Sequence, residues 1–216
     1  MINLAQFKPN LIPNNPKDDS FDRNKTITKN GGHKMYVATR KKDGCRLQLL
    51  NKQVLSRSLK APGSELVVSR FQHLADECAR LNIALDGEFY KHGLKFNAIF
   101  RFFSKGDVTT PKYRAELEKA LAKDPKKFAK DYDGHTIDFL TTFHDDLQFW
   151  LFDGIVLDAP GLTRYQDRMI EIKHRLTQAG LMQDNFLIFP KFLKFDDEEQ
   201  LEELYEDALE FGWEGL

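Results

Sequence analysis

A lysine in a short basic segment is the residue best suited to covalent chemistry. The segment reads Lys41-Lys42-Asp43-Gly44-Cys45-Arg46, a K-x-D-G-x-R pattern that directly follows a run with strand character. Only the uncharged amine is a nucleophile, and at pH 7 an ordinary lysine, with a pKa of about 10.4, is neutral in about one molecule in a few thousand. Nearby cations, here Arg40, Lys42 and Arg46, and a bound metal would raise that fraction. The pattern predicts a nucleophilic lysine, although a solvated basic turn closed by Asp43-Gly44 would contain the same residues.

Strands on both sides of this segment are predicted to position it. Met35 to Thr39, Leu47 to Leu50 and Val54 to Ser56 have the short apolar runs of strands, and Asn51-Lys52 predicts a tight turn between the last two. Ser64 to Leu81 repeats apolar residues at the spacing of one helix face. The reactive lysine is therefore expected to follow one strand directly and to precede a hairpin.

Strands and helices continue to alternate along the rest of the chain. Predicted strands lie at Ile83 to Tyr90, Leu94 to Ile99, Leu147 to Leu157 and Phe186 to Phe195, the last with Pro190 at an edge or a bulge. Predicted helices lie at Lys112 to Lys130 with a break at Pro125, at Tyr165 to Gly180, and from Asp196 or Asp197 to Gly212. Helices of unequal length among strands indicate an α+β domain rather than a helix bundle.

Composition divides the chain into an arm and a domain. Residues 1–33 are rich in Pro, Asn, Asp, Lys and Gly and lack a hydrophobic period, so they predict an irregular N-terminal arm. Residues 34–216 are expected to form the folded domain. Within it, residues 105–146 combine a charged helix with weak hydrophobicity, and we interpret them as an insertion.

The overall composition is that of an ordinary globular protein. The 216 residues are 41% hydrophobic and 30% charged, which excludes a wholly disordered chain, collagen and a disulfide-stapled miniprotein. Apolar runs are much shorter than the roughly 20 residues of a membrane-spanning helix, and the first residues show no secretion signal. Cys45 and Cys78 form no metal-type pair and no disulfide framework. We therefore expect a cytoplasmic protein without a membrane partner.

The net charge of −1 conceals a strong asymmetry. Residues 1–60 hold 13 Lys/Arg and 4 Asp/Glu, a net charge of +9, whereas residues 196–216 hold 10 acidic residues and no Lys or Arg. A basic N-terminal third favours a polyanionic partner. Two solvated faces of opposite charge would explain the asymmetry equally well.

Six short segments occur in an order that points to one protein family. The first is Tyr36 to Arg46, and the others are Leu55 to Lys60, Leu85-Asp86-Gly87-Glu88-Phe89, Trp150-Leu151-Phe152-Asp153, Tyr165-Gln166-Asp167-Arg168 and Phe211-Gly212-Trp213-Glu214-Gly215. Together they resemble the ATP-dependent DNA ligases, especially their compact bacteriophage and viral forms. The resemblance implies the N-terminal adenylylation portion of such a ligase. Its fold would be an α+β nucleotidyltransferase (ATP-grasp-like) domain of mixed, mainly antiparallel sheets with flanking helices.

The resemblance assigns roles to residues of the first segment. It implies that Lys41 attacks the α-phosphate of ATP and becomes a lysyl-AMP phosphoramidate. Asp43 and Arg46 are implied as the other catalytic residues. Thr39, Arg40 and Arg46 are implied in ATP binding, Arg46 through the ribose or a phosphate.

Four residues later in the chain receive roles in the same way. Glu88 would hold the ribose or a metal, and Phe152 would stack on adenine. Arg57 would bind the 5′-phosphate at a nick, for which a guanidinium fork is suited. Glu214 would help to bind the catalytic Mg²⁺ or another divalent cation. The structural alternatives are a solvent-face acid for Glu88, a core aromatic for Phe152 and a hairpin flank for Arg57.

The sequence departs from the family at three places. Lys42 stands where the family usually has an apolar residue, but register to Asp43-Gly44 favours Lys41 as the nucleophile. Residues 105–146 lack a clear counterpart, and their basic helix could touch DNA or form a solvated face. The chain ends at Leu216, directly after the G-x-E-G element. We therefore expect the domain to be incomplete at the C-terminus and the OB-fold domain to be absent. A second polypeptide would then supply the C-terminal strand, a lysine pair and the OB-fold domain, and the isolated chain would be inactive in ligation.

The function implied by the resemblance is the sealing of nicks in duplex DNA. Three steps are implied: lysyl-AMP formation, AMP transfer to a DNA 5′-phosphate, and attack by the 3′-hydroxyl. An RNA ligase or a capping-type nucleotidyltransferase shares the K-x-D-G core, but the Leu55-Ser56-Arg57 segment favours DNA. A non-catalytic nucleic-acid-binding subunit is the alternative from a different class. If the protein is viral, its expected location is the host cell cytoplasm.

Overall fold

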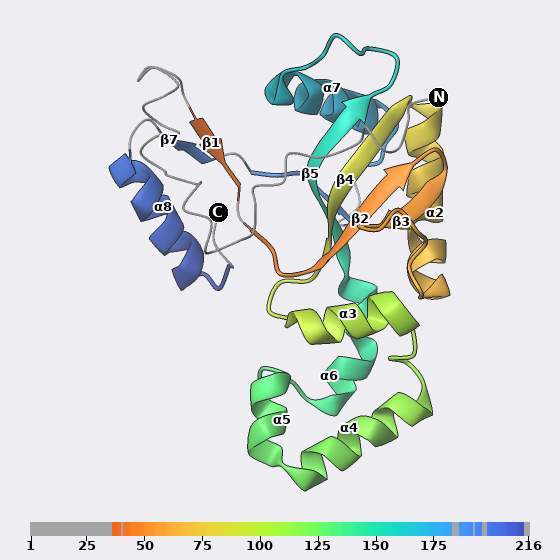
Figure 1. Ribbon diagram of the computed structural model, residues 1–216, viewed down its shortest axis with the longest axis vertical. Coiled ribbons are helices and arrows are strands. Elements are labelled where there is room, and N and C mark those ends of the chain that lie inside the picture. Colours follow the sequence, from red (N-terminus) through yellow and green to blue (C-terminus); the bar gives the residue numbers. More distant parts are fainter. Residues whose placement is uncertain (1–35, 40, 183–185, 192, 196–197, 214–216) are drawn as a thin grey trace. The chain divides into compact units, whose positions relative to one another are not determined.

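Two units make up the chain, and the boundary between them runs through the K-x-D-G-x-R segment. The computed structural model describes residues 36–39, 41–182, 186–191, 193–195 and 198–213 (Figure 1). The larger unit comprises residues 43–189, and the smaller unit combines the described residues up to 42 with those from 190 onward. The predicted arm, residues 1–33, lies outside the described residues.

The larger unit is built on a five-stranded sheet with the strand order β3-β2-β4-β5-β6. Its strands are β2 (Cys45–Leu50), β3 (Gln53–Ser56), β4 (Ile83–Tyr90), β5 (Gln148–Val156) and β6 (Leu187–Ile188). All neighbours are antiparallel except β5 and β6. Asn51 and Lys52, with φ angles of 50° and 64°, form the predicted tight turn between β2 and β3.

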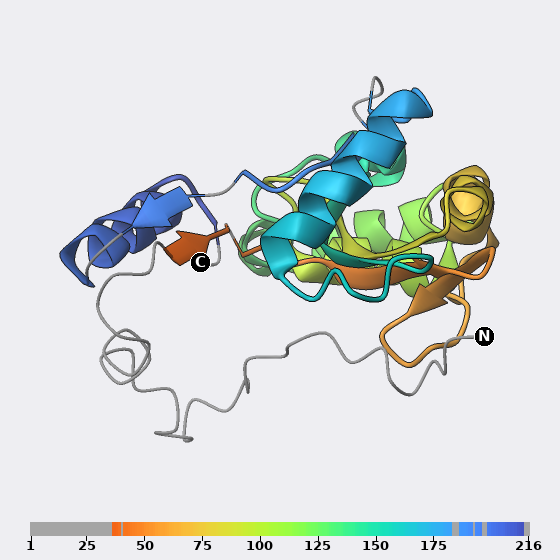
Figure 2. The ribbon, with the colours of Figure 1, turned by 90° about the horizontal axis from the view of Figure 1, so that it is seen from above.

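Helices α2 (Glu65–Arg80) and α7 (Tyr165–Gln178) cover one face of this sheet (Figure 2). The Ser64 hydroxyl accepts a hydrogen bond from the amide of Val67 and caps α2, whose buried stripe matches the predicted one. Phe71 of α2 packs edge-on against Phe89 of β4, with ring centroids 5.5 Å apart. On the same face, α7 approaches β5 so closely that a Cβ at Gly154 would lie 2.6 Å from Ile172.

Beyond the sheet, helices α3 (Phe96–Lys105), α4 (Pro111–Lys123), α5 (Pro125–Asp131), α6 (Ile137–Thr142) and the 3₁₀ helix η2 (Phe143–Asp146) form a lobe (Figure 1). The prediction of a strand from Leu94 to Ile99 is wrong. Ala98, Ile99, Phe102 and Phe103 are buried on one helical face, so the helical period of apolar residues continues beyond Ile99. The predicted break at Pro125 is confirmed: the Asp124 side chain accepts a hydrogen bond from the Lys127 amide and starts a new helix.

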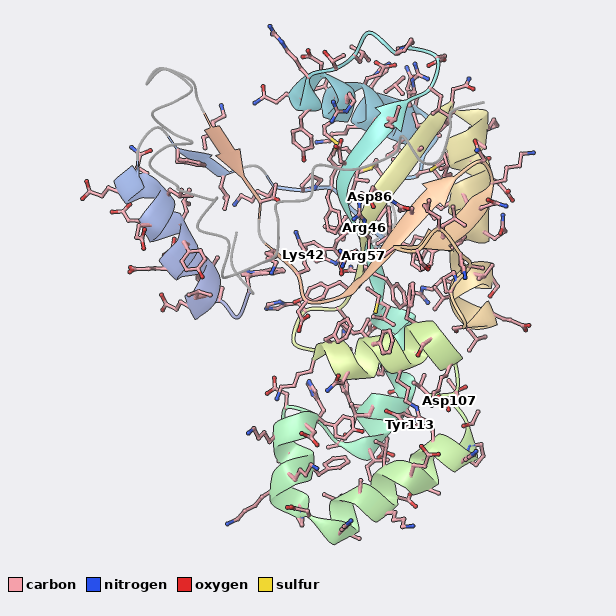
Figure 3. The ribbon with its side chains drawn as sticks, viewed as in Figure 1. Lys42, Arg46, Arg57, Asp86, Asp107 and Tyr113 are labelled. Carbon is pink, nitrogen blue, oxygen red and sulfur yellow. The ribbon has the colours of Figure 1, made fainter. Side chains whose placement is uncertain are left out.

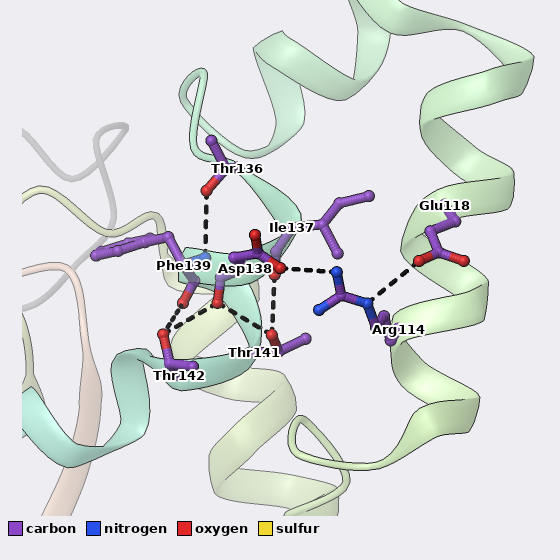
Figure 4. A network of polar contacts seen from close by, with 8 residues as sticks. All are labelled: Arg114, Glu118, Thr136, Ile137, Asp138, Phe139, Thr141 and Thr142. Atoms are coloured by element: carbon purple, nitrogen blue, oxygen red, sulfur yellow. Dashed lines mark hydrogen bonds and ion pairs between the residues drawn. The ribbon is translucent and has the colours of Figure 1, made fainter.

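Charged side chains connect the helices of this lobe. Arg114 of α4 contacts Glu118 one turn later at 3.2 Å and Asp138 of α6 at 2.7 Å (Figure 4). Arg101 of α3 pairs with Asp107 at 2.7 Å and with Glu116 of α4 at 2.9 Å. Side-chain contacts therefore join α3 to α4 and α4 to α6 within the lobe.

The smaller unit contains a two-stranded sheet and one helix. Strand β1 (Tyr36–Ala38) pairs antiparallel with β7 (Leu193–Phe195), and α8 (Glu198–Glu210) follows. Gly212, with φ +74°, lies just past the helix end as predicted. The predicted caps Asp196 and Asp197 lie outside the described residues.

The prediction of one strand from Phe186 to Phe195 is wrong. The segment forms two strands, β6 and β7, which pair in different sheets and belong to different units. Pro190 lies between them and has no amide hydrogen to donate to a strand partner. Among the helices of the described residues, none is both long and apolar enough to cross a bilayer.

Candidate active site

The face of the large sheet opposite the two helices carries a set of polar side chains. Antiparallel partners point to the same face, and successive residues point to opposite faces. Arg46 of β2, Glu88 of β4 and Trp150 of β5 form one cross-strand row. Gln48, Asp86 and Asp153 form the neighbouring row. The sheet therefore brings together residues from three of the predicted motif segments.

Arg46 and Asp86 form a bidentate ion pair on this face (Figure 3). The Nε and Nη2 atoms of Arg46 donate to the two Asp86 carboxylate oxygens at 2.9 and 2.5 Å. Asp86 is fully buried, and burial raises its pKa, while the hydrogen bonds from Arg46 and Gln48 act in the opposite direction. The Oε1 atom of Gln48 is buried without a hydrogen-bond partner among the described residues. The pair therefore occupies two of the Arg46 nitrogens and leaves Nη1 for other contacts.

The glycine of the K-x-D-G-x-R segment lies directly against Glu88. A Cβ at Gly44 would lie 2.5 Å from the Phe89 carbonyl oxygen and 2.7 Å from Glu88 Cγ. Real Cβ atoms do not approach other atoms so closely, so only glycine fits without a shift of β2 or β4. Position 44 must therefore be glycine because the K-x-D-G-x-R segment passes so close to the half-buried Glu88.

Phe152 is the extra residue of a β-bulge in strand β5. Leu151 pairs with Gly87 and Asp153 pairs with Asp86, so Phe152 has no partner on β4. A Cβ at Gly87 would lie 2.4 Å from the Trp150 carbonyl oxygen, so the middle residue of the D-G-E segment must also be small. Bulges redirect side chains and occur often beside active sites.

An aromatic and polar cluster borders Glu88 at the end of β4. The rings of Tyr90 and Trp150 meet edge-on with centroids 5.9 Å apart. The hydroxyl of Tyr90 lies 3.0 Å from Nδ1 of His92, and the indole of Trp150 donates to Gln148 at 3.1 Å. These side chains could form a wall beside a ligand bound near Glu88.

Not all predicted site residues lie on this sheet. Lys41 and Thr39 belong to the smaller unit, where Lys41 is exposed. The ammonium nitrogen of Lys42 lies 5.8 Å from the ring centroid of Trp213. Arg57 is exposed in the turn after β3 and makes no hydrogen bond or ion pair with any described residue (Figure 3). Arg40 and Glu214 lie outside the described residues.

Sequence reasoning missed three residues that shape the site. Asp86 lies in the D-G-E segment, where the resemblance assigns it no role, although a buried acid inside an apolar strand indicates a specific partner. Tyr165 and Arg168 were identified only as a helix start. Tyr165 contacts the backbone of Phe152, and Arg168 contacts Asp153.

Comparisons with known proteins identify the fold. No family model matches the sequence, and no curated protein matches it. A Chlorella virus DNA ligase-adenylate structure is similar at a TM-score of 0.54 and 18% identity, covering 83% of this chain and 52% of that chain. A second structure of that ligase-adenylate gives a TM-score of 0.50 and 20% identity, covering 83% and 51%. A structure named Pmar-Lig_PreS3 gives a TM-score of 0.54 and 16% identity, covering 88% and 39%.

This likeness confirms the predicted fold class. The chain has the α+β, mainly antiparallel fold of the adenylylation domain of viral DNA ligases, which is the resemblance predicted from its motifs. It spans about half the length of the Chlorella virus ligase structure.

Proposed function

We propose that this chain carries the adenylylation step of an ATP-dependent DNA ligase and that the complete enzyme seals nicks in duplex DNA. The observation that carries the proposal is the K-x-D-G-x-R segment, whose Gly44 lies against Glu88 in a fold shared with DNA ligases. Neither half of this observation would be enough alone, because a fold hosts many functions and a short motif occurs by chance.

The proposed reaction is a phosphoryl transfer to lysine. The Nζ lone pair of Lys41 attacks the α-phosphorus of ATP and forms a P–N bond. The bond from that phosphorus to the α,β-bridging oxygen breaks, pyrophosphate leaves, and the amine loses a proton. The register to Asp43-Gly44 favours Lys41 over Lys42, whose ammonium nitrogen lies beside the ring of Trp213.

The sheet residues are proposed to bind and orient the nucleotide. Phe152 offers an aromatic face for adenine, and Glu88 offers a carboxylate for the ribose hydroxyls or a metal. Arg46 is proposed to reach the ribose or a phosphate through Nη1, because Nε and Nη2 are held by Asp86. Asp86 is thus proposed to act on the nucleotide only by orienting Arg46. Thr39, Arg40 and Asp43 remain proposed members of the same site.

ATP and Mg²⁺ are the proposed cofactors. The described residues contain no group of three metal-ligating side chains. Mg²⁺ usually takes one or two carboxylates together with substrate phosphates, so Glu88 with the ATP phosphates would be a suitable set. When bound, the ion would neutralise charge on the phosphates. The role of Glu214 as a second metal ligand stays a prediction.

Nicked duplex DNA is the proposed substrate of the complete enzyme. Arg57 is exposed and has no polar partner among the described residues, which suits a residue that binds a DNA 5′-phosphate. A second polypeptide that supplies a C-terminal strand, a lysine pair and an OB-fold domain stays a prediction.

Labelling with ATP tests the covalent step. With ATP labelled at the α-phosphate and Mg²⁺, we expect an acid-labile, alkali-stable adduct that maps to Lys41. Lys41→Ala should abolish the label, and the matched variant Lys42→Ala should keep it. Label that persists in Lys41→Ala and disappears in Lys42→Ala would refute the assignment.

Nick sealing tests the substrate. Arg57→Ala should leave lysyl-AMP formation nearly intact and slow AMP transfer to nicked DNA. If the complete enzyme seals RNA nicks far better than DNA nicks, the RNA-ligase alternative replaces the proposal.

A further inference from the structure

The β5 bulge needs support from outside the sheet. Because Leu151 pairs with Gly87 and Asp153 with Asp86, the backbone of Phe152 lacks a ladder partner on β4. A buried backbone carbonyl without a hydrogen bond costs about 1–3 kcal/mol. Without a hydrogen bond to the Phe152 carbonyl from another group, regular pairing of β5 with β4 would compete with the bulge.

Tyr165 supplies the missing hydrogen bond. Its hydroxyl donates to the Phe152 carbonyl oxygen at 2.7 Å. Burial, followed by the charge of Asp153, raises the pKa of Tyr165 to about 12, so the hydroxyl keeps its proton at neutral pH. Tyr165 is the first residue of α7, and α7 is packed closely on β5 at Gly154.

Arg168, one turn further along α7, holds the residues that follow the bulge. Its Nη2 donates to both carboxylate oxygens of Asp153 at 3.0 and 2.9 Å. Its Nε donates to the Gly154 carbonyl oxygen at 3.1 Å, and its Nη1 donates to the Thr163 carbonyl oxygen. The guanidinium carbon also lies 5.9 Å from the Tyr165 ring centroid. The first turn of α7 therefore holds the backbone at the Phe152 carbonyl and at the Gly154 carbonyl.

We propose that Tyr165 and Arg168 are positioning residues that hold the β5 bulge and thereby fix Phe152 as the stacking surface for the purine base of ATP. This inference rests on the proposed function, because it concerns the same nucleotide site. In this proposal neither residue touches the nucleotide. Both act by restricting where the Phe152 ring can lie. The ring is therefore already ordered before ATP binds, which lowers the entropy cost of stacking.

Equilibrium ATP binding tests this inference. In Tyr165→Phe we expect the Kd for ATP to rise about two- to tenfold, the size expected for loss of one hydrogen bond. Arg168→Lys, which keeps the charge but loses the planar fork, should act in the same direction. Tyr132→Phe is the matched control, because it removes a tyrosine hydroxyl at the end of α5, within the helical lobe. Its Kd should equal that of the wild type.

A double-mutant cycle with Phe152→Ala separates positioning from general structural support. If Tyr165 acts through the Phe152 ring, Tyr165→Phe should weaken ATP binding in the wild type and have no further effect in Phe152→Ala. An equal effect in both backgrounds, or an unchanged Kd in Tyr165→Phe, would overturn the inference.

Hydrogen exchange and labelling with α-labelled ATP distinguish failure of the positioning role from failure of the proposed function. Backbone amides of β5 should exchange faster in Tyr165→Phe, which detects a loosened bulge without any nucleotide. A wild-type protein that binds ATP but forms no lysyl-AMP would contradict the proposed function alone. Faster β5 exchange with unchanged ATP binding would contradict the positioning role alone.

Discussion

Gly44 and Gly87 are the residues at which the candidate site has no room for a side chain. At both, an added Cβ would lie within about 2.5 Å of a backbone carbonyl oxygen on the neighbouring strand. Such an approach can be relieved only by moving a strand, since the contacted atoms are backbone. The glycines of the K-x-D-G and D-G-E segments are thus explained by the packing of β2, β4 and β5.

Replacing Gly44 by alanine should damage the site. We expect Gly44→Ala to destabilise the protein by about 1–3 kcal/mol, as overpacking does, and to lower lysyl-AMP formation at least about tenfold. Thermal unfolding and α-labelled ATP measure the two effects. Gly161→Ala is the control, because a Cβ at Gly161 meets nothing within 4 Å. Equal behaviour of the two variants would contradict the packing argument.

The two cysteines should be unreactive in the folded protein. Cys45 and Cys78 are both buried, and burial raises the pKa of each thiol, that of Cys78 to about 12. The reactive species is the thiolate, so iodoacetamide at pH 8 should modify neither residue in native protein and both in denaturant. Mass spectrometry of the alkylated chain checks this. Rapid native modification of Cys45 would show that the start of β2 opens readily.

At the scale of elements, the pairing of β2 with β4 decides what Arg46 can do. The register places Arg46 opposite Glu88 and directs its guanidinium to Asp86 in the next row. An ion pair with one fully buried member is sensitive to loss of a single partner, since the other charge is then left uncompensated. The pair therefore links the stability of the sheet to the geometry of the candidate site.

Removing one member of the pair should be worse than removing both. Asp86→Ala should destabilise the protein by about 3–5 kcal/mol, measured by denaturant unfolding. Arg46→Met with Asp86→Leu should recover much of that stability, since similar volume is restored without an unpaired charge. The double variant should still form little lysyl-AMP. Full activity in the double variant would show that Arg46 has no role in nucleotide binding.

At the scale of the whole molecule, the helical lobe is held together by its own contacts, which differ from those of the sheet. Arg101 of α3 joins this helix to the region around α4 by pairing with Asp107 and Glu116, while its guanidinium carbon lies 4.3 Å from the Tyr113 ring centroid. The ion pairing lowers the pKa of Asp107 and raises that of Arg101. Arg101 thus contributes several partly buried contacts between α3 and the other helices of the lobe.

Loss of Arg101 should loosen the lobe and spare the sheet. In Arg101→Ala we expect faster hydrogen exchange in α4, α5 and α6, with a destabilisation of about 1–2 kcal/mol. Exchange in β2 and β4 and the rate of lysyl-AMP formation should be unchanged. Arg114→Ala, which breaks contacts inside the lobe, is the comparison variant. Uniformly faster exchange across the sheet would show that the lobe and the sheet unfold as one unit.

The sequence alone determined the elements whose signals are local. The apolar period of α2, the Asn51-Lys52 turn and the helix break at Pro125 each depend on neighbouring residues, and the sequence predicts all three. The motif segments also predicted the fold, because six short matches in one order are specific even where overall identity to the similar structures is only 16–20%.

Tertiary structure alone decided the features that depend on distant partners. Leu94 to Ile99 is too short for its pattern of apolar residues to distinguish a strand from a helix, and the packing of Phe102 and Phe103 decides for the helix. The division of residues 186–195 between two sheets depends on which strands are available for pairing. The Arg46–Asp86 pair spans 40 residues, and at the Phe152 bulge α7 supplies the hydrogen bond to the Phe152 carbonyl. Register and bulges are set by contacts between segments, which no local pattern records.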